Sequence, residues 1–553
     1  MTEHLVPCAA NMASYNAEEI REREYPQLQG RIYLDHAGTT LYAKSLIETH
    51  CRDLVDNLYG NPHSDNSPSK LSGQLVEDIR DKALRFFGAS STDFDLVFVA
   101  NSTAGMKLVG ESIASYSQRT LSSAPLNPLG SGANNGFGFQ YFYHQDSHTS
   151  LVGLRELALS GSTCLRNDHD VTQWIRNFQA ENSGAQVGPI VLPDDIRALK
   201  CRSQIYTLWD AAALATTSSI DLSSSATAPD FTVVSFYKIF GYPDLGGLII
   251  RKAATHMFQY RRYFGGGTVD MVTNYPSAQD APWYANRTGP PHEYLEDGTL
   301  PFHNIFALSH AIDKHMELFN SMHCISSHTS NLIHETYRAL RNLKHANSTP
   351  LCQILYNSNL GHFGDSRTQG PTIAFSVLSP SGRPYGYVDV ERAADRAGIY
   401  VRSGSVCNPG GMVYLGWEQM EDMQRAWNAG HRCSNPVQEI DGMPTGIIRV
   451  SLGAMSTIAD VNGFVKWLKE TYLDHSLDVE MDTGLNVHKV HQKTLLIRQA
   501  SATKHHFIGP SNAITGKVNP IKKGKGHDQN HGERKSKFLV SRVRRAWHFC
   551  LGP

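Results

Sequence analysis

The sequence predicts an α/β fold, with helices on both faces of a mostly parallel sheet, and two observations carry this prediction. First, helical and strand-like hydrophobic patterns alternate up to about residue 475, as in proteins whose parallel strands are joined by crossover helices. Second, the chain has 553 residues, of which 41% are hydrophobic and 19% charged. The composition is that of a globular protein, and the chain is long enough for roughly two to four domains.

Individual segments show both patterns. Apolar residues recur at every fourth position after Ser67-Pro68, at Leu71, Leu75, Ile79 and Ala83, which predicts a helix with proline in its first turn. The apolar run 95–99 predicts a short buried strand, and residues 101–106 lead from it into another helix. Segments 116–138 and 276–292 are rich in Ser, Gly, Asn and Pro, so we expect loops there.

The domain organisation follows from where the patterns change. The strand-like run 372–377 and the helical pattern after it begin a smaller α+β unit. We therefore expect four parts: an N-terminal extension (1–29), a large domain (30–345), a small domain (346–475) and a tail (476–553). Within the large domain, residues 30–45 are expected to pack near the small domain.

The tail is strongly basic. Between Lys504 and Arg545 there are eleven Lys and Arg residues, opposed only by Asp528 and Glu533. With so little hydrophobic periodicity, this segment is predicted to be disordered. A patch for nucleic acid or an anionic cofactor is the alternative, but no aromatic interleaving supports it. The histidines of the tail lack metal-ligand spacing, so no metal is expected.

Composition also indicates the compartment. The nine cysteines form no C-x-x-C pair, which suits free thiols in a reducing environment. The N-terminus shows no signal-peptide pattern, and no run approaches the roughly 20 apolar residues of a membrane helix. The net charge of −1 gives no reason to expect a polyelectrolyte partner. We expect a cytoplasmic protein with neither a membrane nor a nucleic-acid partner.

Lys238 stands at the end of a strand-like segment. It follows the apolar run 231–236, and a short glycine-containing loop leads to a second run, 246–250. Lysine is rarely buried, and one use for it there is a Schiff base with pyridoxal phosphate. Asp210 ends another apolar run, 205–209, where it could keep the pyridine nitrogen protonated. Lys238 taken alone is most simply a surface lysine, but together with Asp210 it predicts a pyridoxal phosphate site.

Two further positions could serve such a cofactor. Ser102 and Thr103 lie between a strand and a helix, where backbone N–H groups favour phosphate, although an ordinary helix cap explains them equally well. His148 follows the aromatic, strand-like run 140–143. It could stack on a pyridine ring and move protons, whereas a lone histidine is more often structural.

A cysteine and an arginine complete the set. Cys407 lies in a loop, 401–411, that is dense in glycine and small residues and could expose the thiol. A cysteine is more often an inert buried thiol, but the loop and Arg402 favour a nucleophile. Arg449 lies inside the strand-like run 446–451, where burial requires a partner. A substrate carboxylate would serve through a bidentate pair.

These motifs occur in the order found in a known family. Residues from about 30 to 475 resemble the class V aminotransferases, and within them the cysteine desulfurases. The motifs that carry the resemblance are 33–40 (YLDHAGTT), 61–64 (NPHS), the Asp210 and Lys238 strands and the Cys407 loop. The most similar branch is the one that supplies sulfur to the molybdenum cofactor. Its hallmarks are similar to Asp35-His36-Ala37-Gly38, 235–241 (SFYKIFG) and 407–410 (CNPG).

The resemblance implies a fold and a set of roles. The implied fold is the type I fold of pyridoxal-phosphate-dependent transferases, with a mostly parallel seven-stranded sheet in the large domain and a smaller α+β domain. Lys238 would form the Schiff base and Cys407 would become a persulfide. The other implied roles are the ring-nitrogen partner (Asp210), ring stacking (His148), phosphate binding (Ser102, Thr103, Ser235), phosphate binding from a second subunit (Thr299) and substrate-carboxylate binding (Arg449).

The chain departs from the family in three places. Ala213 stands where a glutamine is common, and Tyr237 where a histidine is common. Both differences favour the molybdenum cofactor branch, and both leave the phenolic oxygen of the cofactor without an obvious donor. The sequence ends at Pro553, too soon for the β-rich, cofactor-binding domain of that branch. A truncated chain, a gene-model error and a separately supplied acceptor domain all fit this ending.

The resemblance implies a pyridoxal-phosphate-dependent cysteine desulfurase. It would take sulfur from L-cysteine to a persulfide on Cys407, and then to the molybdenum cofactor of molybdenum hydroxylases of the xanthine dehydrogenase and aldehyde oxidase type. A homodimer is expected, because Thr299 would act across subunits. The alternatives are a general cysteine desulfurase or selenocysteine lyase with another acceptor, and a catalytically silent, truncated scaffold.

Overall fold

The computed structural model describes residues 14–122, 138–183, 205–274, 283–356, 363–366 and 369–474. Residues up to Glu480 cluster as one compact unit. The predicted basic tail lies outside the described residues, and the finer division into domains 30–345 and 346–475 stays a prediction. In the described ranges, no helix is both long and apolar enough to cross a bilayer.

The central sheet has four strands in the order β2-β7-β6-β5. Their bounds are Phe94–Val99 (β2), Gly246–Arg251 (β7), Phe231–Ser235 (β6) and Leu208–Asp210 (β5). Strand β7 is antiparallel to both β2 and β6, whereas β5 and β6 are parallel. Strands β2, β6 and β5 therefore point the same way, and β7 alone is reversed.

This topology confirms the α/β class. Three of the four strands share one direction, as in the expected mostly parallel sheet, and two of the three pairings are antiparallel only because the reversed strand β7 lies between β2 and β6. Among the described residues, this sheet contains four of the seven expected strands. The connection from β6 to β7 spans only residues 236–245, and a parallel crossover needs about a dozen residues or more. A second parallel pair, β3 (Tyr141–His144) with β4 (Ser162–Leu165), forms a sheet of its own.

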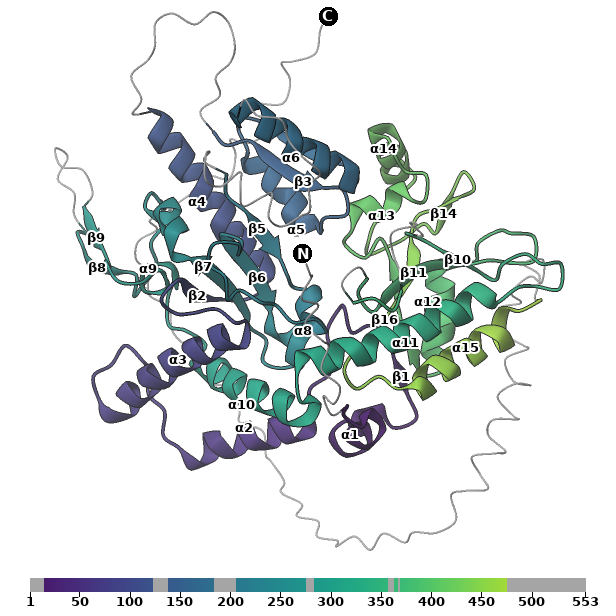
Figure 1. The fold of residues 1–553 in the computed structure, drawn as a ribbon, viewed down its shortest axis with the longest axis horizontal. Helices are drawn as coiled ribbons and strands as arrows, with labels where there is room; N and C mark the ends of the chain where they lie inside the picture. The colour runs from purple at the N-terminus through teal and green to yellow at the C-terminus, as the bar shows by residue number, and fades with distance from the viewer. Residues whose placement is uncertain are drawn as a thin grey trace, which may run out of the picture. The chain divides into compact units, whose positions relative to one another are not determined.

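Alternate residues of the central strands face two different cores. Leu96, Phe98 and Ile249 join one hydrophobic cluster, while Val97 and Leu248 join another, as the period of two in a strand requires. Helix α4 (Ser102–Ser122) contributes to the second cluster. The first is shared with α1 (Ala17–Glu24), α2 (Lys44–Asp56), α3 (Ser67–Phe86) and α10 (Phe302–Phe319). Helices thus cover both faces, as predicted (Figure 1).

A second sheet, antiparallel throughout, follows later in the chain. Its order is β10 (Cys352–Ile354), β11 (Thr372–Val377), β16 (Ile447–Ser451) and β13 (Arg402–Gly404). Its core also takes side chains from α11 (Met322–Asn342), α12 (Tyr387–Arg396) and α15 (Ile458–Tyr472). Leu34 belongs to the same core, and β1 (Ile32–Tyr33) pairs in parallel with β12 (Ile399–Tyr400). The segment around residue 33 thereby packs against this sheet.

The local predictions are largely confirmed, with two corrections. Helix α3 starts at Ser67 with Pro68 in its first turn and Asn66 as its cap. The loop predicted at 116–138 is wrong for its first part, because α4 continues to Ser122 and Tyr116 packs on the core. The loop predicted at 276–292 contains β9 (Tyr284–Asn286) and the start of α9 (Pro291–Leu295), because β9 pairs with β8 (Val269–Val272). Tertiary pairing outweighs composition in both places.

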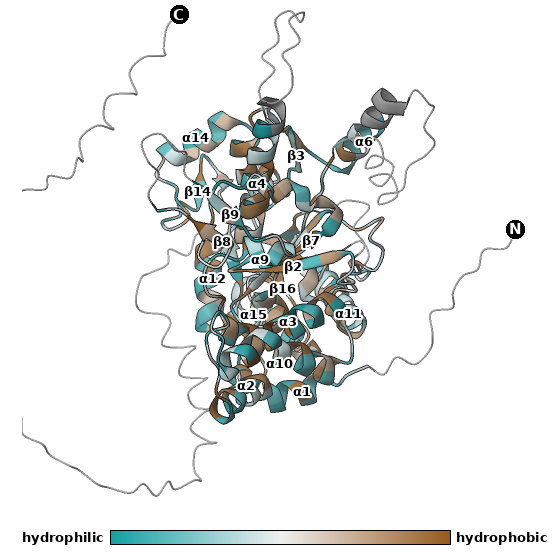
Figure 2. Ribbon diagram, turned by 90° about the vertical axis from the view of Figure 1, so that its left-hand side faces the viewer, coloured by the Kyte–Doolittle hydropathy of each residue, from teal (hydrophilic) through white to brown (hydrophobic). Residues whose placement is uncertain are grey.

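The remaining helices are short or peripheral. Figure 2 shows that hydrophobic and hydrophilic residues are mixed along helices such as α3 and α10, as expected for helices with one face in a core. The other described α-helices and strands are α5 (Thr149–Val152), α6 (Asp168–Ser183), α8 (Phe236–Phe240), α13 (Pro409–Val413), α14 (Met420–Asn428), β14 (Glu439–Ile440) and β15 (Met443–Pro444).

Candidate active site

The carboxyl ends of β2, β6 and β5 meet at one edge of the central sheet, because these strands share a direction. Ser102 begins α4 just after β2, Asp210 ends β5, and Ser235 ends β6. Lys238 follows in the short helix α8. Ligands of open α/β sheets bind at this edge. The structure therefore gathers four of the predicted site residues.

Lys238 lies on the short helix α8, close to the end of β6. The helix starts directly after β6 and ends at Phe240, with Gly241, whose φ is +78°, as its C-cap. A Cβ on Gly241 would lie 2.3 Å from backbone atoms of Leu41 and Tyr42, so only glycine fits there. Burial lowers the pKa of Lys238; Asp210 opposes this shift, and Arg449 reinforces it. The amine thus loses its proton more readily than an exposed lysine.

The predicted phosphate ligands form two hydroxyl pairs at the start of α4, Ser102 with Ser235 and Thr103 with Ser150. The Oγ atoms of Ser102 and Ser235 are 2.6 Å apart, and the Ser102 N–H donates to Ser235 Oγ at 3.2 Å. Both serines are buried. Thr103 is exposed and its Oγ1 lies 2.8 Å from Ser150 Oγ. An α-helix N-terminus with two adjacent hydroxyls has the donors that an anion requires.

His148 caps the first turn of α5. Its Nδ1 accepts a hydrogen bond from the Ser150 N–H at 3.1 Å and lies 3.0 Å from Ser150 Oγ. Partial desolvation lowers the pKa of His148; Asp210 raises it again, and Lys238 lowers it further. His148, Asp210 and Lys238 therefore lie within electrostatic range of one another. Ser150, which links His148 to Thr103, had no distinguishing signal in the sequence.

The Cys407 loop reaches the same region from the second sheet. Val406 and Cys407 both have positive φ angles, 46° and 58°. The Cys407 carbonyl accepts from the Thr149 N–H at 3.0 Å, which places the loop beside the residue that follows His148. The thiol is exposed, and Arg402 Nη2 lies 3.9 Å from Sγ. The predicted nucleophile thus has a cation at its sulfur.

Arg449 already has a partner, and this corrects the reasoning that a substrate must supply one. Its Nη2 donates to Asp35 Oδ1 at 2.6 Å. Its Nε is buried and has no hydrogen-bond partner among the described residues. Arg449 stands opposite Arg402 in the β13–β16 register. Asp35 follows β1, and nothing in the sequence linked it to a residue 414 positions away.

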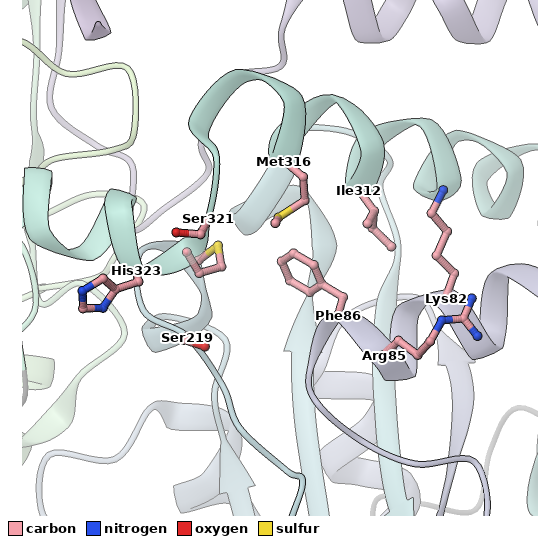
Figure 3. A pocket seen from close by; sticks show the side chains of 9 residues that line it. Lys82, Arg85, Phe86, Ser219, Ile312, Met316, Ser321 and His323 are labelled. Atoms are coloured by element: carbon pink, nitrogen blue, oxygen red, sulfur yellow. The ribbon is translucent and has the colours of Figure 1, made fainter. Parts of the chain in front are cut away.

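Thr299 is exposed in the segment between α9 and α10, so its contact with a second subunit stays a prediction. The structure also contains a surface cavity of about 440 Å³ elsewhere. Figure 3 shows that it is lined from α3 by Lys82, Arg85 and Phe86 and from α10 by Ile312 and Met316. None of the predicted site residues lines it, so it plays no part in the candidate active site.

Comparison with known families agrees with the motifs. Residues 32–123 and 182–464 match the model of the family described as aminotransferase class-V. The chain belongs to the class-V aminotransferase family. This confirms the family expected from the sequence.

Several curated relatives of this class-V aminotransferase share a name. Molybdenum cofactor sulfurases of Aspergillus niger, Emericella nidulans and Botryotinia fuckeliana are 47%, 46% and 44% identical to it. The matches cover 84%, 86% and 84% of this chain and 55%, 56% and 57% of those proteins. The chain therefore spans about half the length of the curated relatives it matches.

Solved structures confirm the fold class. A cysteine desulfurase from Thermococcus onnurineus is 18% identical with a TM-score of 0.59, over 84% of this chain and 99% of that one. A cysteine desulfurase from Escherichia coli is 17% identical with a TM-score of 0.57, over 83% and 98%. At such identities the likeness shows the fold alone, which is the type I fold of pyridoxal-phosphate-dependent transferases.

Proposed function

We propose that this class-V aminotransferase is a pyridoxal-phosphate-dependent L-cysteine desulfurase that forms a persulfide on Cys407. The observation that carries the proposal is one edge of the sheet where a lysine of lowered pKa, an aspartate and a histidine lie within electrostatic range. An exposed thiol with a guanidinium at its sulfur reaches the same region. A transaminase would need no such thiol.

The residues present fit the cofactor. The paired hydroxyls of Ser102 and Ser235 at the start of α4 suit a phosphate group, and Asp210 at the end of β5 suits a cationic ring nitrogen. The buried, unpartnered Nε of Arg449 offers a donor to a substrate carboxylate. When bound, pyridoxal phosphate supplies the electron sink for chemistry at the substrate α-carbon.

The chain's own groups then have distinct tasks. Because burial lowers its pKa, Lys238 can present a neutral amine that takes the proton from the substrate α-carbon and returns it. Asp210 would pair with the ring nitrogen, and partial burial lowers the pKa of His148, which favours a neutral, stacking imidazole. Arg449 binds the α-carboxylate and fixes its orientation.

Cys407 performs the sulfur transfer. Only the thiolate is nucleophilic, and the guanidinium of Arg402 lies 3.9 Å from the sulfur. The thiolate attacks the substrate sulfur; the S–S bond forms while the C–S bond breaks. The electron pair of the C–S bond passes to the substrate carbon, which takes up a proton. Alanine leaves and Cys407 holds the persulfide, so no external oxidant is consumed.

The proposed acceptor is the molybdenum cofactor, and the proposed partners are molybdenum hydroxylases of the xanthine dehydrogenase and aldehyde oxidase type. The support is the shared name of relatives that are 44% to 47% identical. We also propose a cytoplasmic homodimer, in which the exposed Thr299 reaches the phosphate site of the second subunit. Sedimentation analysis of the Thr299→Ala variant, together with its cofactor affinity, tests this arrangement.

Loss of the lysine should remove the cofactor linkage. Lys238→Ala is expected to abolish the visible absorbance band that the purified protein shows with pyridoxal phosphate, because no other amine lies at the end of β6. Lys107→Ala, an exposed lysine on α4, is the control and should keep the band. A band of unchanged intensity in Lys238→Ala would remove Lys238 from the site.

The desulfurase reaction itself is tested by a single turnover with L-cysteine. Alanine should appear in equal amount to a persulfide mapped to Cys407 by mass spectrometry. Cys407→Ala should keep the absorbance band but form no persulfide, whereas Cys433→Ala, which removes another exposed thiol, should react normally. Alanine release with sulfur on a different cysteine would contradict the assignment of Cys407, and no alanine from cofactor-loaded protein would contradict the proposed activity.

A further inference from the structure

Three potential metal ligands meet between α2 and α10, and none of them has a task in the proposed desulfurase site. His50 and Asp53 are three residues apart on α2, so their side chains share a face of the helix. His310 comes from α10. One ligand atom from each residue lies within 4.8 Å of the other two, and Asp53 Oδ2 is only 3.1 Å from His310 Nε2.

The carboxylate of Asp53 is oriented by its neighbours. Tyr59 donates its hydroxyl to Oδ1 at 2.8 Å, and Asn57 donates Nδ2 to the same oxygen at 3.0 Å. The other oxygen, Oδ2, faces His310. Metal-binding carboxylates are commonly held by hydrogen bonds of this kind, which fix the ligand before the ion arrives.

His50 is the observation that an ordinary ion pair leaves unexplained. A hydrogen-bonded pair of Asp53 and His310 accounts for two of the three residues. His50, however, is only 4% exposed, and its Nδ1 is buried without a hydrogen-bond partner in the described part of the chain. Buried polar atoms almost always have a partner. A bound cation at this cluster would give His50 a reason to be there.

We propose that His50, Asp53 and His310 bind a divalent transition-metal ion, with Zn²⁺ as the preferred ion. Two imidazoles and one carboxylate form a typical zinc ligand set, and a water molecule would complete a tetrahedron. Zinc ligands lie about 2.0–2.2 Å from the ion. Asp53 and His310 already have a compatible separation, and His50 moves toward them when the ion binds. The side chains of Asp53 and His310 are 22% and 24% exposed, so the ion and its water can enter.

The ion would cross-link two helices, α2 and α10. Helix α2 spans residues 44–56 and α10 spans residues 302–319, so the ion joins segments that are far apart in the sequence. An ion that binds the folded chain but not the unfolded chain stabilises the folded state by mass action. This role does not depend on the proposed desulfurase activity, because no ligand of the ion belongs to that site.

Calorimetric titration of the purified full chain with ZnCl₂, after dialysis against a chelator, tests the site. The wild-type chain should bind one more ion than the Asp53→Asn and His310→Ala variants. In these variants the affinity for zinc at this site should fall roughly 100-fold or more, which exceeds the loss expected when a residue that only orients a ligand is removed. Tyr59→Phe, which removes only the orienting hydroxyl, should lose roughly tenfold. His323→Ala is the control, since it removes an exposed histidine of α11 that is not among the three residues of the cluster.

The same chains are then compared by thermal unfolding and zinc X-ray absorption. Zinc should raise the melting temperature of the wild type and the control but not that of Asp53→Asn, an isosteric change chosen to preserve folding. The absorption spectrum should show nitrogen and oxygen ligands. Unchanged zinc binding in Asp53→Asn, an equal loss in His323→Ala, or sulfur ligands that identify the cysteines would each overturn the proposal. If Asp53→Asn does not fold, the graded loss in Tyr59→Phe decides.

Discussion

At the scale of single residues, neighbours decide what a side chain can do. Lys238 is an ordinary lysine in sequence, yet burial lowers its pKa while Asp210 opposes the shift. Arg449 is charged inside a sheet, and Asp35 rather than a substrate neutralises it. Burial of an arginine is therefore weak evidence for a substrate site. The unpartnered Nε is the stronger evidence.

Replacing Arg449 should separate binding from catalysis. Arg449→Lys keeps the positive charge for Asp35 but loses the planar fork that pairs with a carboxylate. A charged hydrogen bond contributes about 1.5–3 kcal/mol, so KM for L-cysteine should rise roughly 10- to 100-fold while kcat changes little. Arg392→Lys, an exposed arginine on α12, is the control. Steady-state kinetics showing a lower kcat at unchanged KM would contradict a role in carboxylate binding.

At the scale of elements, short connections place the reactive groups. Helix α8 is five residues long and is followed by a glycine C-cap, so Lys238 lies close to the end of β6. Helix α13 follows the Cys407 loop, and Asn408 caps it through the Gly411 N–H at 3.3 Å. Gly410 allows α13 to approach residues 145–146 closely. These close approaches bring a loop from the second sheet to the edge of the first.

A methyl group at Gly410 should displace the nucleophile. A Cβ there would lie 2.5 Å from the Gln145 carbonyl oxygen and 2.6 Å from Asp146 Oδ1, so the loop in Gly410→Ala must shift. A misplacement of about 1 Å can cost roughly 100-fold in rate. Persulfide formation should therefore slow strongly while the cofactor absorbance stays.

Gly153→Ala serves as the control for that change, because a Cβ at Gly153 meets nothing within 4 Å and its φ of −62° suits any residue. Rapid-mixing kinetics of persulfide formation give the readout. If Gly410→Ala and Gly153→Ala react equally fast, the close approach of α13 does not position the thiol.

At the scale of the whole molecule, buried histidines make the stability of the fold depend on pH. His36 is fully enclosed between Thr40 and Ser456, at 2.9 and 3.3 Å. Burial lowers the pKa of His36 to about 3 and that of His315, in α10, to about 4, from an ordinary 6.5. Both are therefore neutral in the folded chain at neutral pH.

Acid should destabilise the fold through these residues. Between pH 6.5 and 3, the unfolded chain binds a proton at His36 and the folded chain does not. Stability therefore falls as pH falls through this window, by up to about 1.4 kcal/mol per pH unit for one such group. His36→Gln should show a shallower fall in the urea midpoint between pH 6.5 and 4. An identical pH profile for the variant and the wild type would contradict the buried neutral state.

The sequence alone predicted much of the candidate site, because its signals are local. Hydrophobic runs mark where β2, β5 and β6 end, and Lys238, Asp210 and Cys407 were proposed from the residues directly around them. The motif order also determined the family. The reversed direction of β7 was missed, although the short segment 236–245 limits it to a hairpin.

Only the tertiary structure decided which distant residues meet. Asp35 reaches Arg449 across 414 positions, and His310 reaches Asp53 across 257. The docking of Cys407 beside Thr149 joins the two sheets in the same way. Such contacts have no periodicity or turn chemistry of their own. They arise because packing each hydrophobic core fixes the positions of whole strands and helices, and polar side chains are brought together as a consequence.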